Sequence, residues 1–388
     1  MTVPPRALRH VVQVGFFNDP QGRTPVQLLD SWVTLVDVAE AASRSGMHVS
    51  VVQASAHRAQ LQRNGVGYHF LPFGAGEPGG LAALLRQLAP HVVHVHGLDF
   101  HREVIALATC VPDIPIILQD HASRPPRLWR RLHWRRGLAP ASGIAFCALG
   151  QARPFTGAGL IGAHTRVYEI PESTSRFAPG DRDDARRLTG VEGSPAVLWV
   201  GHLDYNKDPL TVLDGVSIAA RSLPQLRLYC CFGEAPLRRS VEQRIASDPH
   251  LGQRVTLLGR VPHARVEQLM RAADVFVLGS HREGSGYSLI EALACGLPPV
   301  VTDIPSFRSL TGQGAVGMLW PCGDSRALGA ALQAIAARTG SEMRIQVRAH
   351  FERELSFDAL GAKLAAMYAD VSASPRGVAQ SRCVQQGA

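Results

Sequence analysis

The chain has 388 residues with a hydrophobic share of 46% and a charged share of 19%, as expected for an α/β enzyme of two or three domains. Its formal net charge of +8 favours anionic partners such as phosphates, nucleic acid or lipid headgroups. No apolar run reaches the roughly 18 residues of a membrane span, and no signal-type apolar core precedes Val11, so the sequence predicts a cytoplasmic protein.

The first half alternates short apolar runs with helical patterns, which predicts βαβ units and a parallel sheet. Strands are predicted at Val11–Phe17, His48–Gln53, Tyr68–Pro72, Val92–His96, Ile114–Gln119 and Ile144–Ala148. Helices are predicted at Ser31–Ser45, Gly80–Leu88, His101–Thr109 and near Arg127–Arg136. A polar loop with Gly22 and Arg23 follows the first strand, where ligands of such sheets bind. This loop carries no G-x-G-x-x-G motif, which argues against an NAD enzyme.

Histidines gather near the carboxyl ends of two predicted strands. His96 and His121 occupy positions where ligands collect in parallel sheets. The series with His94 and His101 would also permit a zinc site, but its spacing follows a strand and no cysteine accompanies it. We therefore predict substrate contacts rather than a metal.

The segment Arg124–Arg136 reads RPPRLWRRLHWRR. On a helix, the apolar side chains Leu128, Trp129 and Leu132 share one face. The other face carries four arginines with Trp134 among them, namely Arg127, Arg130, Arg131 and Arg135. This pattern is typical of an amphipathic surface helix with a basic rim, and it would also suit contact with anionic lipid or an anionic substrate.

A turn-rich seam over Ile170–Asp181 separates this half from a second βα series. Strands are predicted at Ala196–Val200, Leu226–Phe232, Val255–Leu258, Val275–Leu278, Pro299–Thr302 and Met318–Trp320. Helices are predicted at Pro209–Ser222, Leu237–Ser247, Arg265–Ala272, Ser288–Cys295, Ser325–Arg338, Glu342–Glu354 and Phe357–Asp370. We predict two doubly wound α/β domains, 1–170 and 171–355, facing each other across a cleft, a helix over 356–372 and a disordered tail over 373–388. Asp181-Arg182-Asp183 could suggest a metal, but it opens a helical pattern, so Asp181 is predicted to be an N-cap.

A loop after the predicted strand Ala196–Val200 holds His202 and Lys207, and Pro209 then begins a helix. Lysine occurs only at Lys207 and Lys363, so its presence in this loop is notable. An ammonium here would be a point charge for a diphosphate, and His202 could add a donor. The alternative is a pair of solvated loop side chains.

The strongest signal is the segment SHREGSGYSLIEALACGLP, Ser280–Pro298, which lies between a predicted strand and a predicted helix. Gly284 and Gly286 would allow the backbone to approach a ligand, and the amides from Gly286 to Ser288, with Ser285 and Tyr287, would face an anion. Glu283 precedes this turn and Glu291 lies within the helix, so both carboxylates could flank one bound molecule. The alternative is two surface glutamates beside a turn.

Together these residues resemble the GT4 family of retaining glycosyltransferases with the GT-B fold. Glu283 to Glu291 matches the family's E-x7-E pattern, and the following Ala292–Thr302 resembles its usual continuation. The resemblance implies that Glu283 contacts the donor sugar, that Glu291 contacts the ribose and that Lys207 binds the donor diphosphate. His202 stands where the family usually has an arginine. The last predicted helix resembles the element that crosses back to the first domain.

The resemblance further implies transfer from a sugar nucleotide to a glycan, lipid-linked or small-molecule acceptor, with retention at the anomeric carbon and without a metal or other cofactor. His121 would lie near the reacting sugar, and Gly22, Arg23 and His96 would serve the acceptor. A sugar-nucleotide epimerase, a donor hydrolase and a non-catalytic sugar-nucleotide-binding protein are the alternatives. Nucleic acid is not predicted as a partner, because no recognition module is readable, whereas peripheral contact with an anionic membrane remains compatible with the basic segment.

Overall fold

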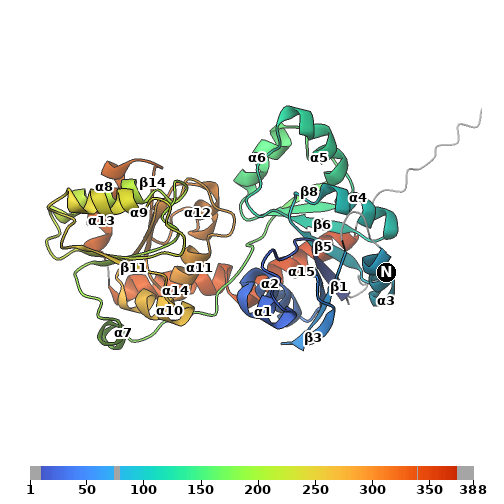
Figure 1. Cartoon of the computed structure of the whole chain (residues 1–388), viewed down its shortest axis with the longest axis horizontal. Helices are drawn as coiled ribbons and strands as arrows, with labels where there is room; N and C mark the ends of the chain where they lie inside the picture. The colour runs from blue at the N-terminus through green and yellow to red at the C-terminus, as the bar shows by residue number, and fades with distance from the viewer. Residues whose placement is uncertain (1–9, 74–78, 339, 374–388) are drawn as a thin grey trace, which may run out of the picture. The chain divides into compact units, whose positions relative to one another are not determined.

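The computed structural model describes residues 10–73, 79–338 and 340–373, which form two compact α/β units. Unit 1 comprises the described residues up to Phe146, residues 152–170 and those from Gly361 onward, and unit 2 comprises Cys147–Gln151 and Pro171–Leu360 (Figure 1). Most of the predicted tail, 374–388, lies outside the described residues. The predicted α/β fold class is confirmed, because each unit is built on its own largely parallel sheet.

Unit 1 contains an eight-stranded sheet in the order β3-β4-β2-β1-β5-β6-β7-β8, in which only the β3–β4 pair is antiparallel. The strands are β1 (His10–Gly15), β2 (His48–Ala54), β3 (Ala59–Arg63), β4 (Val66–Leu71), β5 (Val92–His96), β6 (Ile116–Gln119), β7 (Gly143–Phe146) and β8 (Arg166–Glu169). The six predicted strands are all present. Their buried apolar runs reflect strands that are covered on both faces, whereas β3 and β8 are half-exposed edge strands and were missed.

The helices of unit 1 are α1 (Pro25–Ser31), α2 (Val33–Arg44), α3 (Gly79–Leu88), α4 (His101–Cys110), the 3-10 helix η1 (Leu128–Arg130), α5 (Arg131–Leu138) and the part of α6 (Leu149–Gly157) from Ala152 onward. One placement within the basic segment was wrong. Trp134 is only 4% exposed and packs in the core of unit 1, so it does not share the arginine face. The helix α5 turns its Trp134 side inward because this ring stacks with His101 of α4 and packs near Phe155.

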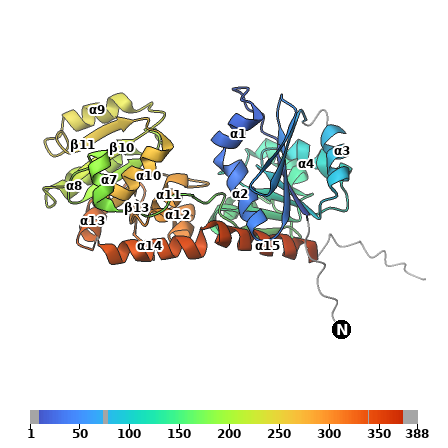
Figure 2. The same ribbon diagram turned by 90° about the horizontal axis from the view of Figure 1, so that it is seen from below.

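The last helix, α15 (Phe357–Ala373), begins in unit 2, and its residues from Gly361 belong to unit 1 (Figure 2). Gly361 lies so close to α2 that a Cβ atom would be 2.3 Å from the Ala41 carbonyl oxygen. Further along, the Tyr368 hydroxyl lies 2.8 Å from Nδ1 of the buried His94 on β5. The part of α15 that belongs to unit 1 is therefore anchored by a close backbone contact and a buried hydrogen bond.

Unit 2 contains a six-stranded, all-parallel sheet in the order β11-β10-β9-β12-β13-β14. Its strands are β9 (Ala196–Val200), β10 (Arg227–Cys231), β11 (Val255–Gly259), β12 (Val275–Leu278), β13 (Pro299–Thr302) and β14 (Met318–Trp320). Its helices are α7 (Arg182–Thr189), α8 (Pro209–Ala220), α9 (Arg238–Ala246), α10 (His263–Ala272), α11 (Tyr287–Ala294), α12 (Pro305–Leu310), α13 (Ser325–Ala336) and α14 (Ser341–Glu354). All six predicted strands are present, and the short α12 was not predicted.

The strand order fixes where each unit can bind a ligand. In unit 2 the chain leaves the central β9 toward β10 on one side, while β12 pairs on the other side. In unit 1 the same reversal occurs at β1, between β2 and β5. Loops that follow the strands at such a switch point diverge and leave a crevice at the carboxyl edge of the sheet. The loops after β9 and β12, and those after β1 and β5, therefore mark the candidate sites.

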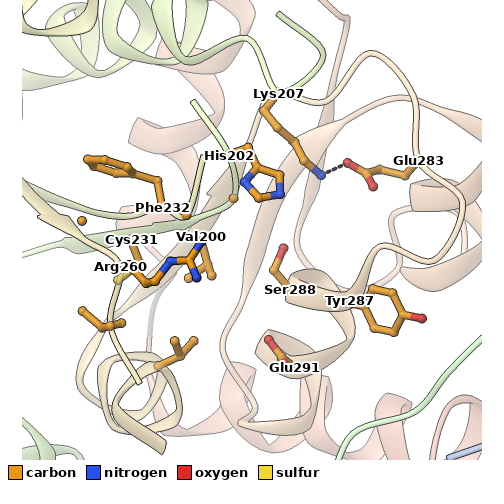
Figure 3. A pocket seen from close by; sticks show the side chains of 15 residues that line it. Val200, His202, Lys207, Cys231, Phe232, Arg260, Glu283, Tyr287, Ser288 and Glu291 are labelled. Atoms are coloured by element: carbon orange, nitrogen blue, oxygen red, sulfur yellow. Dashed lines mark hydrogen bonds and ion pairs between the residues drawn. The ribbon is translucent and has the colours of Figure 1, made fainter. Parts of the chain in front are cut away.

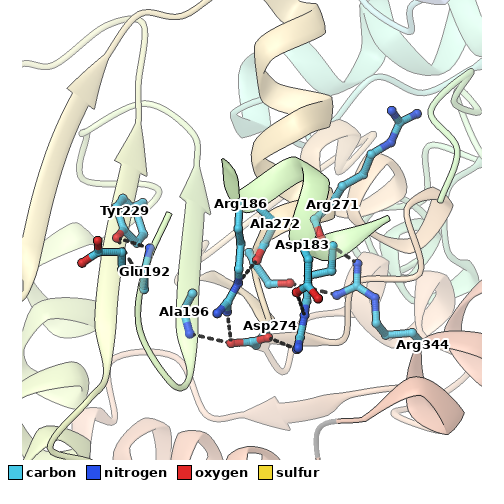
Figure 4. A network of polar contacts seen from close by, with 11 residues as sticks. Asp183, Arg186, Glu192, Ala196, Tyr229, Arg271, Ala272, Asp274 and Arg344 are labelled. Carbon is cyan, nitrogen blue, oxygen red and sulfur yellow. Dashed lines mark hydrogen bonds and ion pairs between the residues drawn. The ribbon is translucent and has the colours of Figure 1, made fainter. Parts of the chain in front are cut away.

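A polar network at the amino-terminal ends of the unit 2 strands, opposite the candidate site, holds α7 in place (Figure 4). Asp274, which precedes β12, accepts hydrogen bonds from Arg182 at 3.0 Å, from Arg186 at 2.8 Å and from the Ala196 amide at 2.8 Å. As predicted, Asp181 is the N-cap of α7, and its carboxylate accepts from the Asp184 amide at 2.8 Å. The network joins α7 to the beginnings of β9 and β12.

We expect Asp274→Asn to lower the free energy of unfolding of unit 2 by about 2 kcal/mol, because it removes the charge that both arginines share. Asp183→Asn is the matched control, since this carboxylate is 78% exposed and lies 3.9 Å from Arg182. The control should change stability by no more than about 0.5 kcal/mol. Urea denaturation of both variants provides the measurement, and equal midpoints for the two would contradict the structural role of Asp274.

Candidate functional site

A pocket of about 480 Å³ opens at the carboxyl edge of the unit 2 sheet (Figure 3). Loops after β9, β10, β11 and β12 and the first turns of α11 line it. Six of the residues predicted to bind the donor or to act on it meet here, namely His202, Lys207, Glu283, Tyr287, Ser288 and Glu291. Gly284, Ser285 and Gly286 are not among the lining residues.

Lys207, on the loop after β9, and Glu283, on the loop after β12, form an ion pair (Figure 3). Their side chains are only 16% and 12% exposed, so neither is a solvated loop side chain. The Lys207 amide donates to Asp204 at 2.8 Å, which holds the loop, and Asp208 caps α8 from a left-handed conformation. A half-buried lysine whose partner is a single carboxylate is available to a diphosphate that competes for it.

His202 lies beside Lys207 in the same pocket, on the loop that follows β9 (Figure 3). Its Nδ1 atom accepts a hydrogen bond from the Glu234 amide at 3.0 Å. The proton of a neutral imidazole must then reside on Nε2, which makes that atom a donor. The family that the sequence resembles usually has an arginine at the position of His202. The histidine is a smaller donor, and the hydrogen bond from the Glu234 backbone amide determines its tautomer.

Arg260 is a lining residue that the sequence reading missed. It follows the last residue of β11, and Gly233 separates it from His202, since a Cβ atom on Gly233 would lie 3.4 Å from His202 Cε1 and 3.5 Å from Arg260 Nη2. The pocket thereby gathers an ammonium, an imidazole donor and a guanidinium. The position of Arg260 two residues after the predicted strand Val255–Leu258 was the signal that could have identified it.

The turn before α11 is shaped by Gly286. This residue has φ +60°, and a Cβ atom on it would lie 2.8 Å from Leu310 Cδ1, so a side chain would be both strained and crowded. Ser285 instead donates to Glu172 at 2.5 Å, and Gln151 donates to the Glu283 carbonyl at 2.7 Å. Ser285 and Gly286 therefore position the turn, while Tyr287 and Ser288 face the pocket.

Glu291 lies on the pocket side of α11 and contacts His263 of α10 at 2.5 Å. The sequence reading did not identify His263, which is 62% exposed, whereas Glu291 is 17% exposed. Glu283 and Glu291 line one pocket, on opposite sides of the amino-terminal turn of α11 (Figure 3). A single molecule of sugar-nucleotide size can therefore contact both carboxylates.

A second pocket, of about 580 Å³, opens at the switch point of unit 1. Arg23, His96 and His121 line it together with aromatic side chains that include Phe17 and Trp32. Asp19 binds the Arg23 guanidinium at 2.8 and 3.0 Å, and this hydrogen-bonded partner lowers the pKa of Asp19 to about 2. Gly22 does not line the pocket; its carbonyl lies 3.3 Å from the His57 ring.

Three imidazoles stack beside this second pocket, and two of them, His96 and His121, line it. His94 and His96 have ring centroids 4.8 Å apart, and His96 Nδ1 lies 3.3 Å from His121 Nε2. Burial lowers the pKa of His94 to about 3, and burial with the neighbouring imidazoles holds the pKa of His96 well below its usual value. His94 and His96 are therefore neutral at pH 7. Among the described residues, no group of three or more His, Cys, Asp or Glu side chains is arranged to hold a metal ion.

We expect acidification to destabilise unit 1, because the unfolded chain protonates His94 near pH 6.5 and the folded chain only near pH 3. Stability is complete above pH 6.5 and falls by about 1.4 kcal/mol per pH unit below it for this one group. Urea denaturation at pH 7 and pH 5 should show a loss that is about 2 kcal/mol smaller in His94→Gln. An identical loss in the two proteins would contradict this assignment.

Known proteins resemble this chain in sequence and in fold. Residues 181–349 match the family described as Glycosyl transferases group 1. The chain is 25% identical over 265 residues to the GDP-mannose:cellobiosyl-diphosphopolyprenol alpha-mannosyltransferase of Xanthomonas campestris, an alignment that covers 65% of this chain and 66% of that protein, just under two thirds. The family match covers the whole pocket of unit 2, from Val200 to Glu291.

Solved structures support the fold of the whole chain. Sucrose-phosphate synthase from Thermosynechococcus elongatus superposes with a TM-score of 0.67 at 18% identity, covering 94% of this chain and 99% of that one. HepE from Anabaena, solved in complex with UDP and glucose, gives a TM-score of 0.66 at 18% identity, covering 93% of this chain and 100% of that one. These similarities confirm the GT-B fold that the sequence predicted.

Proposed function

We propose that this chain, whose residues 181–349 form a Glycosyl transferases group 1 domain, is a retaining glycosyltransferase of the GT4 type. It takes a hexose from a nucleoside-diphosphate sugar bound in the pocket of unit 2 and passes it to an acceptor hydroxyl. The observation that carries the proposal is the convergence of Lys207, His202 and Arg260 with the carboxylates of Glu283 and Glu291 in one pocket.

In this proposal the diphosphate of the donor binds between Lys207, the Nε2 proton of His202 and the guanidinium of Arg260. Glu283 accepts hydrogen bonds from hydroxyls of the donor sugar, and Glu291 accepts from the ribose. Tyr287 and Ser288 complete the wall at the first turn of α11, where backbone amides favour an anion. Gly284, Ser285 and Gly286 fix the turn that presents Glu283.

The reaction breaks the bond between the anomeric carbon and the β-phosphate oxygen. A new bond forms between that carbon and the acceptor oxygen on the same face, and the acceptor proton passes to the leaving phosphate oxygen. Lys207, His202 and Arg260 stabilise the charge that develops on the diphosphate. These side chains supply the neutralisation that a divalent cation gives in other enzymes, so the proposal includes no metal and no other cofactor.

The acceptor belongs to the pocket of unit 1. Arg23 and His96 contact it, and His121 contacts the acceptor or the transferred sugar. Aromatic rings beside these polar groups suit the apolar faces of sugars, and a glycan or lipid-linked acceptor fits this chemistry. The Xanthomonas relative, whose name states a diphosphopolyprenol-linked acceptor, supports the lipid-linked class. Gly22 contributes through the loop that carries Arg23.

A screen of nucleoside-diphosphate sugars for thermal stabilisation of the protein, followed by mass spectrometry of products, tests the proposal. We expect one nucleotide to stabilise the protein and, with acceptor, to yield a glycosylated product in the presence of EDTA. Release of free sugar without any acceptor product would identify a hydrolase, and an isomerised donor would identify an epimerase. Thermal stabilisation without turnover would identify a non-catalytic sugar-nucleotide-binding protein. The proposal would be overturned if no nucleotide sugar stabilised the protein.

A further inference from the structure

An exposed apolar surface on unit 1 is not used by the proposed reaction. It consists of Leu128 and Trp129 of η1 and Leu132 of α5, which are 73%, 70% and 56% exposed. We call these three residues and the surrounding arginines, Arg127, Arg130 and Arg135, the Trp129 surface. Single exposed apolar residues are common, but three within five positions, including a tryptophan, form a patch that needs a reason.

The packing of α5 fixes the outward direction of this patch. Trp134, Gly137 and Leu138 form the buried side of the helix. A Cβ atom on Gly137 would lie 2.2 Å from His101 Cβ, so α5 approaches α4 as closely as a backbone can. The apolar side chains of this segment therefore form two groups. Trp134 and Leu138 pack in the core, whereas the apolar residues of the Trp129 surface are exposed to solvent.

The charged residues of the segment that carries the patch have one sign. Between Asp120 and Glu169 the sequence contains no acidic residue, and the segment from Arg124 to Arg136, both included, contains six arginines. The Arg127 guanidinium lies 5.3 Å from the centre of the Trp129 ring. In the described part of the chain, no carboxylate pairs with Arg127, Arg130 or Arg135. Unneutralised guanidinium groups beside exposed leucine and tryptophan side chains are complementary to anionic headgroups above an acyl layer.

We propose that the Trp129 surface docks unit 1 on an anionic phospholipid membrane. Leu128, Trp129 and Leu132 enter the headgroup region, and the arginines contact lipid phosphates. No helix in the described ranges is long and apolar enough to cross a bilayer, so this contact is peripheral. A second copy of the chain fits less well, because like-charged arginines would face each other, and a nucleic acid offers no partner for the two leucines. The inference goes beyond the proposed transfer and does not depend on it.

Co-sedimentation of the full chain with vesicles tests the proposal directly. We expect binding to vesicles that contain phosphatidylglycerol and at least tenfold weaker binding to pure phosphatidylcholine vesicles. About 1 M NaCl should release most of the protein, because it shortens the Debye length to about 3 Å. Equal binding to both vesicle types, or to neither, would overturn the proposal.

Variants separate the charged contribution from the apolar one. Arg127→Glu with Arg130→Glu should weaken binding to the anionic vesicles by at least about 30-fold. Arg239→Glu with Arg326→Glu is the matched control, since it makes the same charge change at exposed arginines in the first turns of α9 and α13. The affinity of the control for the anionic vesicles should stay within about threefold of that of the unmodified protein. An equal loss of affinity in both double variants would show that only the net charge matters and would overturn the proposal.

Leu128→Gln with Leu132→Gln should also weaken binding at least tenfold, because about two buried side chains are removed from the acyl boundary. Both are exposed, so folding should be unchanged by circular dichroism. Brominated phosphatidylglycerol should quench the fluorescence of the unmodified protein more than that of Trp129→Phe. Equal quenching of the two proteins would contradict insertion of Trp129, and a dimer that the Leu variant dissociates, without vesicle binding, would assign the surface to a second copy instead.

Discussion

Glu283→Ala is expected to reduce kcat for sugar transfer by about 1,000-fold while the affinity for the donor nucleoside diphosphate changes by less than about threefold. Glu283 is only 12% exposed and is paired with Lys207, so its carboxylate is held at the pocket wall before the donor arrives. Removing it takes away a contact to the sugar but leaves Lys207 free to bind phosphate. The loss should therefore fall on kcat rather than on nucleotide binding.

Steady-state kinetics with the donor found by stabilisation screening, together with titration calorimetry, would measure both quantities. Glu342→Gln, at an exposed carboxylate in the first turn of α14, is the control and should leave both unchanged. Glu283→Gln should recover only a small part of the activity, because an amide still accepts a hydrogen bond but carries no charge. Wild-type turnover in Glu283→Ala would reject the role assigned to this residue.

Lys207→Ala is expected to weaken binding of the donor by about 100-fold, close to the 2.7 kcal/mol that such a factor represents. Two effects act in the same direction. The ammonium no longer contacts the diphosphate, and the Glu283 carboxylate loses its cation and repels the incoming phosphates. Titration calorimetry with the nucleoside diphosphate alone isolates this effect from any contact to the sugar.

The composition of the chain supplies the matched control. Lys207 and Lys363 are its only two lysines, and Lys363, on α15, is not among the residues that line the unit 2 pocket. Lys363→Ala should bind the nucleotide as the unmodified protein does. A double variant with Glu283→Gln should recover part of the affinity, since the repulsive carboxylate is then absent. Unchanged affinity in Lys207→Ala would show that Lys207 does not clamp the phosphates.

The buried parts of the fold could be predicted from the sequence, and the partly exposed parts could not. Strands such as Ala196–Val200 and Val275–Leu278 are buried on both faces, and their continuous apolar runs gave the observed bounds. The edge strand Ala59–Arg63 alternates polar and apolar residues and carries no comparable run. The helix Pro305–Leu310 is too short to show a helical period.

For the site, local motifs identified what lies within one loop but not what folding brings in from another. Lys207, Glu283 and Glu291 belong to segments whose spacing is informative by itself, and one pocket brings them together. Arg260, which follows β11, lines the pocket, and His263, at the start of α10, contacts Glu291; the sheet order brings both toward residues that are distant in sequence. The direction of Trp134 could not be read either, because an amphipathic pattern does not say which apolar side chain meets the core.

The ion pair between Lys207 and Glu283 also bears on which molecules the pocket of unit 2 accepts. Free inorganic phosphate could bind the Lys207 ammonium, but it would leave the largely buried Glu283 carboxylate without a cation. A free sugar could donate hydrogen bonds to this carboxylate, but it would not replace the carboxylate as the partner of Lys207. In the proposed binding mode, an intact sugar nucleotide would satisfy both groups at once. We therefore expect the ion pair by itself to favour binding of the intact donor over binding of phosphate or free sugar, independently of any contact to the nucleotide base.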